Sequence, residues 1–97
     1  MKRVQDKIAI VTGGAAGLGE AISRRLAEEG AKVIITDIQV DAGQRIADQL
    51  NGTFLEQDVT DETRWDEVIQ QVEAQYGTLH ILVNNAGILA PVDAPNP

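Results

Sequence analysis

The sequence predicts an α/β protein built on a doubly wound parallel sheet. Short apolar runs alternate with helical patterns along the 97 residues. The runs are continuously apolar, which is typical of strands that are covered on both faces. The resulting element order is βαβαβαβ. Right-handed crossover connections convert this order into a parallel sheet with helices on both sides.

Four apolar runs predict the strands. Each run is rich in β-branched or large apolar residues and is bounded by Gly, Asp or Asn, which favour turns. The four runs are Ile8–Val11, Val33–Ile35, Phe54–Leu55 and Ile81–Val83.

Two helices are expected between the first three strands. The first runs from about Leu18 to Glu29, and Gly30 is its expected C-terminal stop. Its predicted core face comprises Leu18, Ala21, Ile22 and Leu26. The second helix is expected to follow Asp41, which would serve as its N-cap, and to end at Asn51 and Gly52.

A third helix is predicted from about Asp61 to Tyr76, and Gly77 closes it. Its apolar residues recur at helical spacing and should face the core; they are Trp65, Val68, Ile69, Val72 and Tyr76. We expect a single dinucleotide-binding domain over residues 1–89. Residues 90–97 contain all three prolines and predict a tail or the start of a loop.

Composition excludes several classes of function. The net charge of −7 and the scattered basic residues argue against nucleic-acid binding. The absence of cysteine excludes disulfides and thiolate metal sites. No apolar stretch approaches the ~20 residues that a membrane span requires. We therefore expect a cytoplasmic protein with no membrane or nucleic-acid partner.

A glycine-rich turn follows the first predicted strand, with the pattern T-G-x-x-x-G-x-G from Thr12 to Gly19. A pyrophosphate needs bare backbone N–H groups and the positive end of a helix, and this placement supplies both. Gly19 is followed by Glu20 and not by the lysine of a P-loop, so a mononucleotide P-loop is excluded. A glycine-rich loop without a ligand remains the alternative.

This spacing resembles the cofactor turn of the short-chain dehydrogenase/reductase family, which has a Rossmann-like fold. The resemblance implies a sheet of strand order 3-2-1-4 that is truncated here after its fourth strand. It also implies cofactor contacts from the turn, namely from Gly13, Ala16, Gly17, Leu18 and Gly19. We expect Gly19 to leave the approach of the pyrophosphate open.

An acidic residue follows the second predicted strand. Asp37 lies about 20 residues beyond the turn, the usual spacing for an acid that binds the adenosine ribose hydroxyls. Its charge would repel a 2′-phosphate, and Ala16 and Ile38 stand where NADP-binding relatives often carry a basic residue. We therefore predict NAD rather than NADP, with Ile38 beside Asp37 in the site. A surface Asp in a loop is the alternative.

Two further motifs match the family pattern. Asp58 and Val59, expected to close the third strand, would border the adenine; Asp58 could equally cap the third helix. After the fourth strand, the resemblance implies that Asn84 braces the sheet through backbone hydrogen bonds. It also implies cofactor contacts from Asn85, Ala86 and Gly87. An ordinary Asn-Gly turn is the alternative for this last motif.

No catalytic residue and no metal ligand is predicted. The family uses a Tyr-x-x-x-Lys pair, but the single tyrosine, Tyr76, is followed four residues later by His80. We expect His80 to be a solvated turn residue. An exposed fourth strand at the sheet edge would favour association, so a homo-oligomer is expected.

Three hypotheses about function follow. The first is the NAD-binding portion of an oxidoreductase that transfers hydride between NAD(H) and an alcohol or ketone substrate. The second is a non-catalytic module that binds NAD or ADP. The third is an S-adenosylmethionine methyltransferase, which is disfavoured because Thr12 stands where such enzymes usually have an acid.

Overall fold

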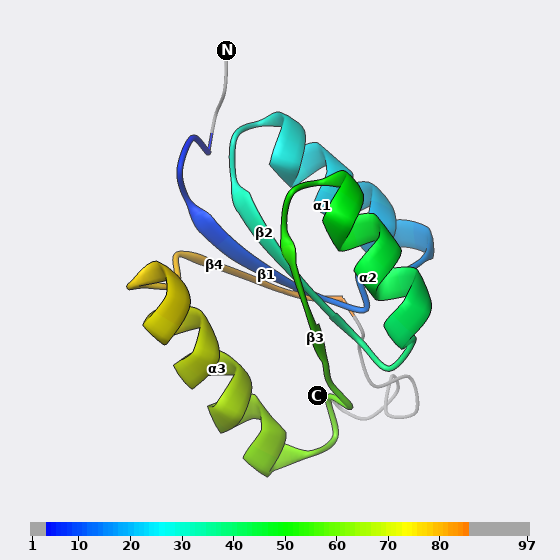
Figure 1. Ribbon diagram of the computed structural model, residues 1–97, viewed down its shortest axis with the longest axis vertical. Coiled ribbons are helices and arrows are strands. Elements are labelled where there is room, and N and C mark those ends of the chain that lie inside the picture. The colour runs from blue at the N-terminus through cyan, green and yellow to red at the C-terminus, as the bar shows by residue number, and fades with distance from the viewer. Residues whose placement is uncertain (1–3, 86–97) are drawn as a thin grey trace, which may run out of the picture.

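The computed structural model describes residues 4–85 and contains four strands and three helices in alternation (Figure 1). In chain order these are β1 (Ile8–Thr12), α1 (Gly17–Glu28), β2 (Lys32–Asp37), α2 (Val40–Gln49), β3 (Thr53–Glu56), α3 (Glu62–Tyr76) and β4 (Ile81–Asn84). The predicted βαβαβαβ order is confirmed.

The four strands form one parallel sheet in the order β3-β2-β1-β4, as the resemblance implied. Helices α1 and α2 cover one face of the sheet and α3 covers the other (Figure 1). The helices that follow β1 and β2 therefore lie on one side of the sheet. Helix α3, which precedes β4, lies on the other side. This arrangement places a topological switch point between β1 and β4.

Each face of the sheet packs its own apolar core. On the α3 side the buried residues are Ile8, Ile10, Ile34, Val68 and Val72. On the α1 and α2 side they are Val11, Val33, Ile35, Ile46 and Ala47. Strands β1 and β2 contribute to both clusters, which explains why their apolar runs do not alternate with polar residues.

The start of α1 differs from the prediction. Leu18 is 69% exposed and does not belong to the core face. The buried residues of α1 are Gly19 and Ser23, and at Gly19 the helix lies against the Gly13 carbonyl of the preceding turn, so no side chain fits there. Ala21 is exposed as well, so the predicted core face is wrong for two of its four residues, while Ile22 and Leu26 pack against the core as predicted.

The predicted cap of α2 is also wrong. The helix begins at Val40, its N-cap is Gln39, and no side chain caps it. Asp41 lies inside the first turn, where its negative charge is favoured by the positive end of the helix.

His80 is exposed, as predicted, and it also extends the pairing of β1 with β4. Its backbone N–H donates to the Ile8 carbonyl at 3.0 Å. In return, the Ile8 N–H donates to the Nδ1 atom of His80, also at 3.0 Å. The imidazole therefore takes the place of a strand carbonyl at the amino end of β4.

Helix α2 packs closely on β3 at a glycine, which has no side chain. Gly43 is buried in the middle of α2, and a Cβ atom built there would overlap the ring of Phe54. The aromatic ring of β3 thus fills the space that any other residue at position 43 would occupy.

We predict that Gly43→Ala lowers the free energy of unfolding by about 1–3 kcal/mol, because overpacking outweighs the better helix propensity of alanine. Urea denaturation measures the change. Adding Phe54→Leu to this variant should recover part of the loss, since it removes the colliding ring. A Gly43→Ala protein more stable than the wild type would contradict the packing described here.

Candidate functional site

The turn between β1 and α1 is fastened to the end of β2. The N–H groups of Gly13 and Gly14 donate to the Thr36 carbonyl at 2.8 and 3.3 Å. The next N–H group, that of Ala15, donates to the Asp37 carboxylate at 3.1 Å. Gly13 has a φ of +67°, which favours glycine and lets the chain turn back over the sheet edge.

Helix α1 begins without a side-chain cap. Its N-cap is Ala16, whose methyl group cannot accept a hydrogen bond from the first turn. The N–H groups of Gly17, Leu18 and Gly19 have no intrahelical acceptor because they belong to that turn. A Cβ atom at Gly17, where φ is +57°, would meet nothing within 4 Å. The positive end of α1 is therefore open to an anion.

Gly19 has a different role from the one expected. It is buried, and a Cβ atom there would overlap the carbonyl oxygen of Gly13. The space that Gly19 leaves is therefore filled by the turn itself rather than kept free for a ligand. The same carbonyl oxygen accepts a hydrogen bond from the Asn85 side-chain amide at 3.3 Å.

Asp37 is the last residue of β2 and lies beside the turn. Only 9% of it is exposed. One carboxylate oxygen accepts from Ala15 N–H at 3.1 Å and the other from Gln39 N–H at 3.0 Å. These two backbone donors fix the orientation of the carboxylate. The next residue, Ile38, is 67% exposed and stands at the same edge of the sheet.

Asp58 and Val59 lie in the loop between β3 and α3. Strand β3 ends at Glu56, so the prediction that these residues close the strand is wrong. Asp58 does not cap α3 either; the N-cap is Asp61, which accepts from the Arg64 N–H at 3.2 Å. Beyond Glu56 one further hydrogen bond joins the chain to β2, from the Gln57 N–H to the Asp37 carbonyl at 3.1 Å. The Asp58 carbonyl then accepts from the Asp61 N–H at 3.0 Å, in the turn that leads into α3.

The Asp58 carboxylate is exposed but held by the loop. Its Oδ1 atom accepts from the Thr60 hydroxyl at 2.7 Å and from the Thr60 N–H at 2.9 Å. These two donors, first the hydroxyl and then the backbone, hold the pKa of Asp58 below its ordinary value. The Val59 carbonyl accepts from the Trp65 indole at 2.9 Å, which ties the loop to α3.

The end of β4 braces the same region from the other side. The Thr12 hydroxyl lies 3.3 Å from the Val83 carbonyl oxygen and 3.2 Å from the Asn84 side-chain oxygen, and it can donate to either. Asn84 thus holds β1 through its side chain as well as through the strand pairing. Ala86 and Gly87 lie outside the described residues.

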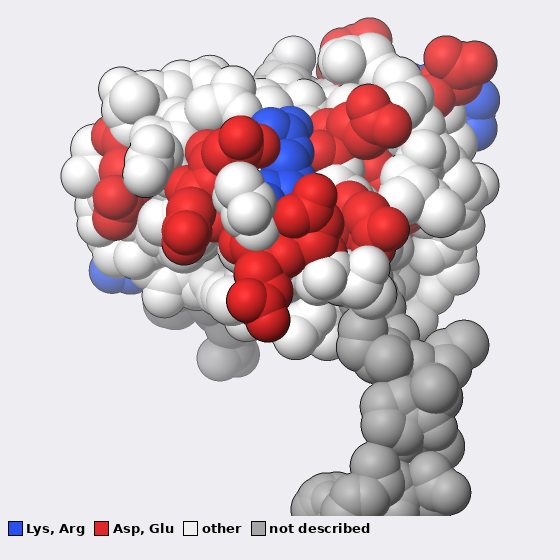
Figure 2. All heavy atoms as spheres, turned by 90° about the horizontal axis from the view of Figure 1, so that it is seen from below, with Lys and Arg blue, Asp and Glu red and all other residues white. Residues whose placement is uncertain are grey.

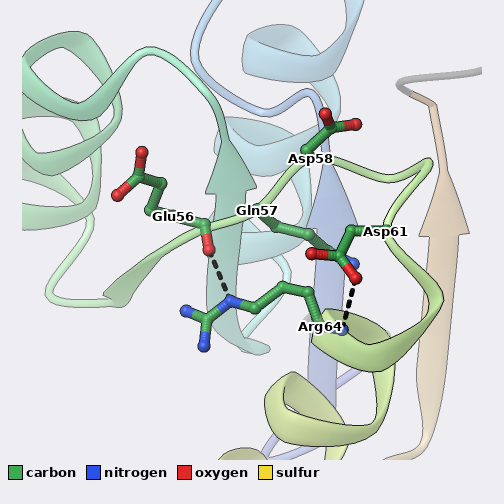
Figure 3. A pocket seen from close by; sticks show the side chains of 5 residues that line it. All are labelled: Glu56, Gln57, Asp58, Asp61 and Arg64. Atoms are coloured by element: carbon green, nitrogen blue, oxygen red, sulfur yellow. Dashed lines mark hydrogen bonds between the residues drawn. The ribbon is translucent and has the colours of Figure 1, made fainter.

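An open hollow of about 410 Å³ lies beside Asp58 (Figure 3). Its lining residues are Glu56, Gln57, Asp58, Asp61 and Arg64. Apart from Asp58, none of them was predicted as a site residue, since no motif includes them. The Arg64 Nε atom donates to the Glu56 carbonyl at 2.8 Å, which closes one side of the hollow.

Acidic side chains dominate this end of the molecule. Figure 2, seen from below, shows Asp and Glu residues gathered around a basic side chain. Within residues 4–85, no group of three or more His, Cys, Asp or Glu side chains is arranged to hold a metal ion. None of the helices in that part of the chain is long and apolar enough to cross a membrane.

The geometry brings most of the predicted residues together. The turn, Asp37 and Asn85 meet at the carboxyl ends of β1, β2 and β4, at the switch point of the sheet. Asp58 lies in the loop after β3, at the same edge. Tyr76 is remote from them, because its hydroxyl pairs with the Thr53 hydroxyl at the opposite end of β3 at 2.7 Å.

Comparison with known proteins agrees with this geometry. The sequence profile of the family described as short chain dehydrogenase matches residues 7–96. The chain belongs to the short chain dehydrogenase family. The match covers all the predicted cofactor residues, including those outside the described part of the structure.

Relatives in this family include characterised enzymes. The chain is 47% identical over 93 residues to a 3-beta-hydroxysteroid dehydrogenase of Comamonas testosteroni, covering 94% of this chain and 37% of that protein. It is 42% identical over 90 residues to an NADP-dependent (R)-specific alcohol dehydrogenase of Lentilactobacillus kefiri, covering 89% of this chain and 36% of that protein. The chain thus spans little more than a third of the length of these relatives.

A solved structure shows the same fold. The crystal structure of a hydroxysteroid dehydrogenase from Escherichia coli superposes with a TM-score of 0.83 at 33% sequence identity. The superposition covers 88% of this chain and 37% of that chain. The Rossmann-like fold predicted from the glycine turn is confirmed.

We predict that Thr60→Val raises the pKa of Asp58 toward its ordinary value, because the stronger of its two donors is lost. A pH titration followed by NMR of the side-chain carboxyl carbon measures it. The lowered pKa of the wild type implies a small stabilisation that is present above the ordinary pKa and is lost as the pH falls through the lowered value.

The matched control for this experiment is Thr63→Val. It makes the same substitution at an exposed position in the first turn of α3 and should leave the titration of Asp58 unchanged. Identical Asp58 titrations in the Thr60→Val protein and the wild type would show that the hydroxyl does not hold the carboxylate.

Proposed function

We propose that this chain forms the dinucleotide-binding part of an oxidoreductase that transfers hydride between NAD(H) and an alcohol or ketone. The observation that supports the proposal most directly is the uncapped, open start of α1 beside the fixed carboxylate of Asp37. Membership of the short chain dehydrogenase family and the dehydrogenases among its relatives support the reaction class. The nicotinamide cofactor would supply the hydride chemistry when bound.

The start of α1 would bind the pyrophosphate. Three N–H groups of its first turn lack helical acceptors, and the helix dipole adds positive potential at the same point. No basic side chain is required for this contact, which fits a strongly acidic protein. Gly17 leaves open space at this point, because a Cβ atom there would meet nothing within 4 Å.

Asp37 would bind the adenosine ribose and select NAD over NADP. Its two oxygens each accept one backbone N–H, and a carboxylate oxygen has a further acceptor position for a ribose hydroxyl. A 2′-phosphate at the same place would face the carboxylate charge, and neighbouring Ile38 and Ala16 offer no positive charge. The Lentilactobacillus relative is described as NADP-dependent, so the choice rests on these residues rather than on family membership.

The loop after β3 would border the adenine. Asp58 presents an exposed carboxylate whose free oxygen could accept from the adenine amino group, while Val59 lies next to it. On the other side, Asn85 together with Ala86 and Gly87 would line the cofactor near the switch point. The amide of Asn85 is already engaged with the Gly13 carbonyl, so its contribution would be to hold the turn.

A non-catalytic module that binds NAD or ADP is the second candidate. It rests on the position of Tyr76, the last residue of α3, whose hydroxyl pairs with Thr53 at the amino end of β3 and so lies far from the glycine turn. The methyltransferase hypothesis loses its support, since the family match is to dehydrogenases. The cytoplasmic location, the homo-oligomeric state and the domain boundary after residue 89 stay predictions from the sequence.

We predict that Asp37→Ala weakens NAD binding and narrows the preference over NADP by about 1–3 kcal/mol, the size of a lost hydrogen bond to a charged group. Calorimetric titration with both dinucleotides measures the two affinities. Asp66→Ala, which removes one exposed acid from α3, is the control for net charge and should leave the ratio unchanged. An unaltered NAD:NADP ratio in the Asp37 variant would remove this residue from the site.

We predict that Gly17→Ala and Gly77→Ala cost similar stability, about 1–2 kcal/mol, because both positions have positive φ and open surroundings. Only Gly17→Ala should weaken cofactor binding, since its methyl group would stand in front of the helix amides. Thermal denaturation and NAD titration of the two variants separate the effects. Equal NAD affinity in both proteins would contradict the proposed position of the pyrophosphate.

A further inference from the structure

Strands β2 and β3 end in two buried polar side chains that share one face of the sheet. Thr36 is fully buried and Gln57 is 2% exposed. Thr36 pairs with Leu55, and Gln57 lies two residues beyond Leu55, so both side chains project toward the α3 side. Leu55 packs against the α3 core, which confirms the face. The two polar residues therefore cap that core at the carboxyl edge of the sheet.

Neither side chain has a hydrogen-bond partner among the described residues. The unpartnered atoms are the Thr36 hydroxyl oxygen and both polar atoms of the Gln57 amide. Buried polar atoms in folded proteins are nearly always paired with protein or ordered water. Three unpaired atoms on this one face of the sheet therefore call for a polar partner.

The direction of the Gln57 side chain is consistent with such a partner. In Figure 3 it extends inward from the end of β3, in the opposite direction from Glu56, and it also forms part of the wall of the open hollow. Its backbone N–H donates to the Asp37 carbonyl at 3.1 Å. Gln57 thus stands between the strand that carries Asp37 and the loop that carries Asp58.

We infer that Thr36 and Gln57 hold ordered water between them. Both side chains are neutral, and each offers a donor and an acceptor, which suits water better than a cation or an anion. Such a water can accept from the Thr36 hydroxyl and donate to the Gln57 side-chain oxygen. The bridge would tie the end of β2 to the start of the β3–α3 loop, and it does not depend on the proposed function.

The inference predicts the direction in which variants change the urea midpoint of unfolding. If water bridges the two groups, Gln57→Met and Thr36→Val each leave a polar partner stranded, and each lowers the urea midpoint of unfolding. The double variant, which removes both partners, should lose less than the sum of the single losses. Gln70→Met makes the same substitution at an exposed position of α3 and reports the intrinsic effect of methionine.

Single variants with a higher urea midpoint than the wild type would overturn the inference. If the three atoms are simply unpaired, both single variants raise the urea midpoint, corrected for the Gln70→Met control, and the two gains add. A high-resolution crystal structure of the wild-type protein decides the matter independently of how the variants fold. Water density within hydrogen-bond distance of both side chains is expected. A protein side chain in that place, or a Gln57 amide turned to solvent, would refute it.

Discussion

The glycine turn owes its position to contacts with the end of β2 and with the residue after β4. Its first two amides are bonded to the Thr36 carbonyl, its third to the Asp37 carboxylate, and its Gly13 carbonyl receives the Asn85 amide. The start of α1 presses on the same carbonyl oxygen through Gly19, where no side chain fits. Because these contacts fix the turn from several sides, they also fix the position of the open end of α1 at the switch point of the sheet.

The sheet supplies the rigidity that this arrangement needs. Strands β1 and β2 are buried on both faces, and their apolar residues divide between two separate cores. Polar side chains accumulate where the strands end, at Thr12, Thr36 and Asp37. The carboxyl edge is therefore the place where a well-packed interior meets groups that can bind a polar ligand. At the start of α1, backbone N–H groups and the helix dipole supply positive potential without a basic side chain.

The sequence predicts the fold well because strand burial and helix periodicity are local patterns. Continuous apolar runs located all four strands, and Asp37 was correctly expected at the end of β2. The errors arise where the distance between elements decides the outcome. Leu18 and Ala21 are exposed because the buried side of α1 runs through Gly19 and Ser23. The packing of Gly43 against Phe54, which no sequence pattern predicted, depends on how closely α2 approaches β3. Gln57 belongs to no sequence motif, and only the structure shows that its side-chain amide is buried without a hydrogen-bond partner.

The most direct test of this account is a titration of the protein with NAD, followed by the backbone amide signals in NMR spectra. The account predicts that the largest shifts fall on residues 16–19, at the start of α1, with further shifts at Asp37 and at Asp58. The amide signals of Gly77 and Thr78, two exposed residues at the far end of α3, should not shift. Shifts confined to other surfaces, or none at millimolar NAD, would contradict the claim that the uncapped end of α1 is a dinucleotide site.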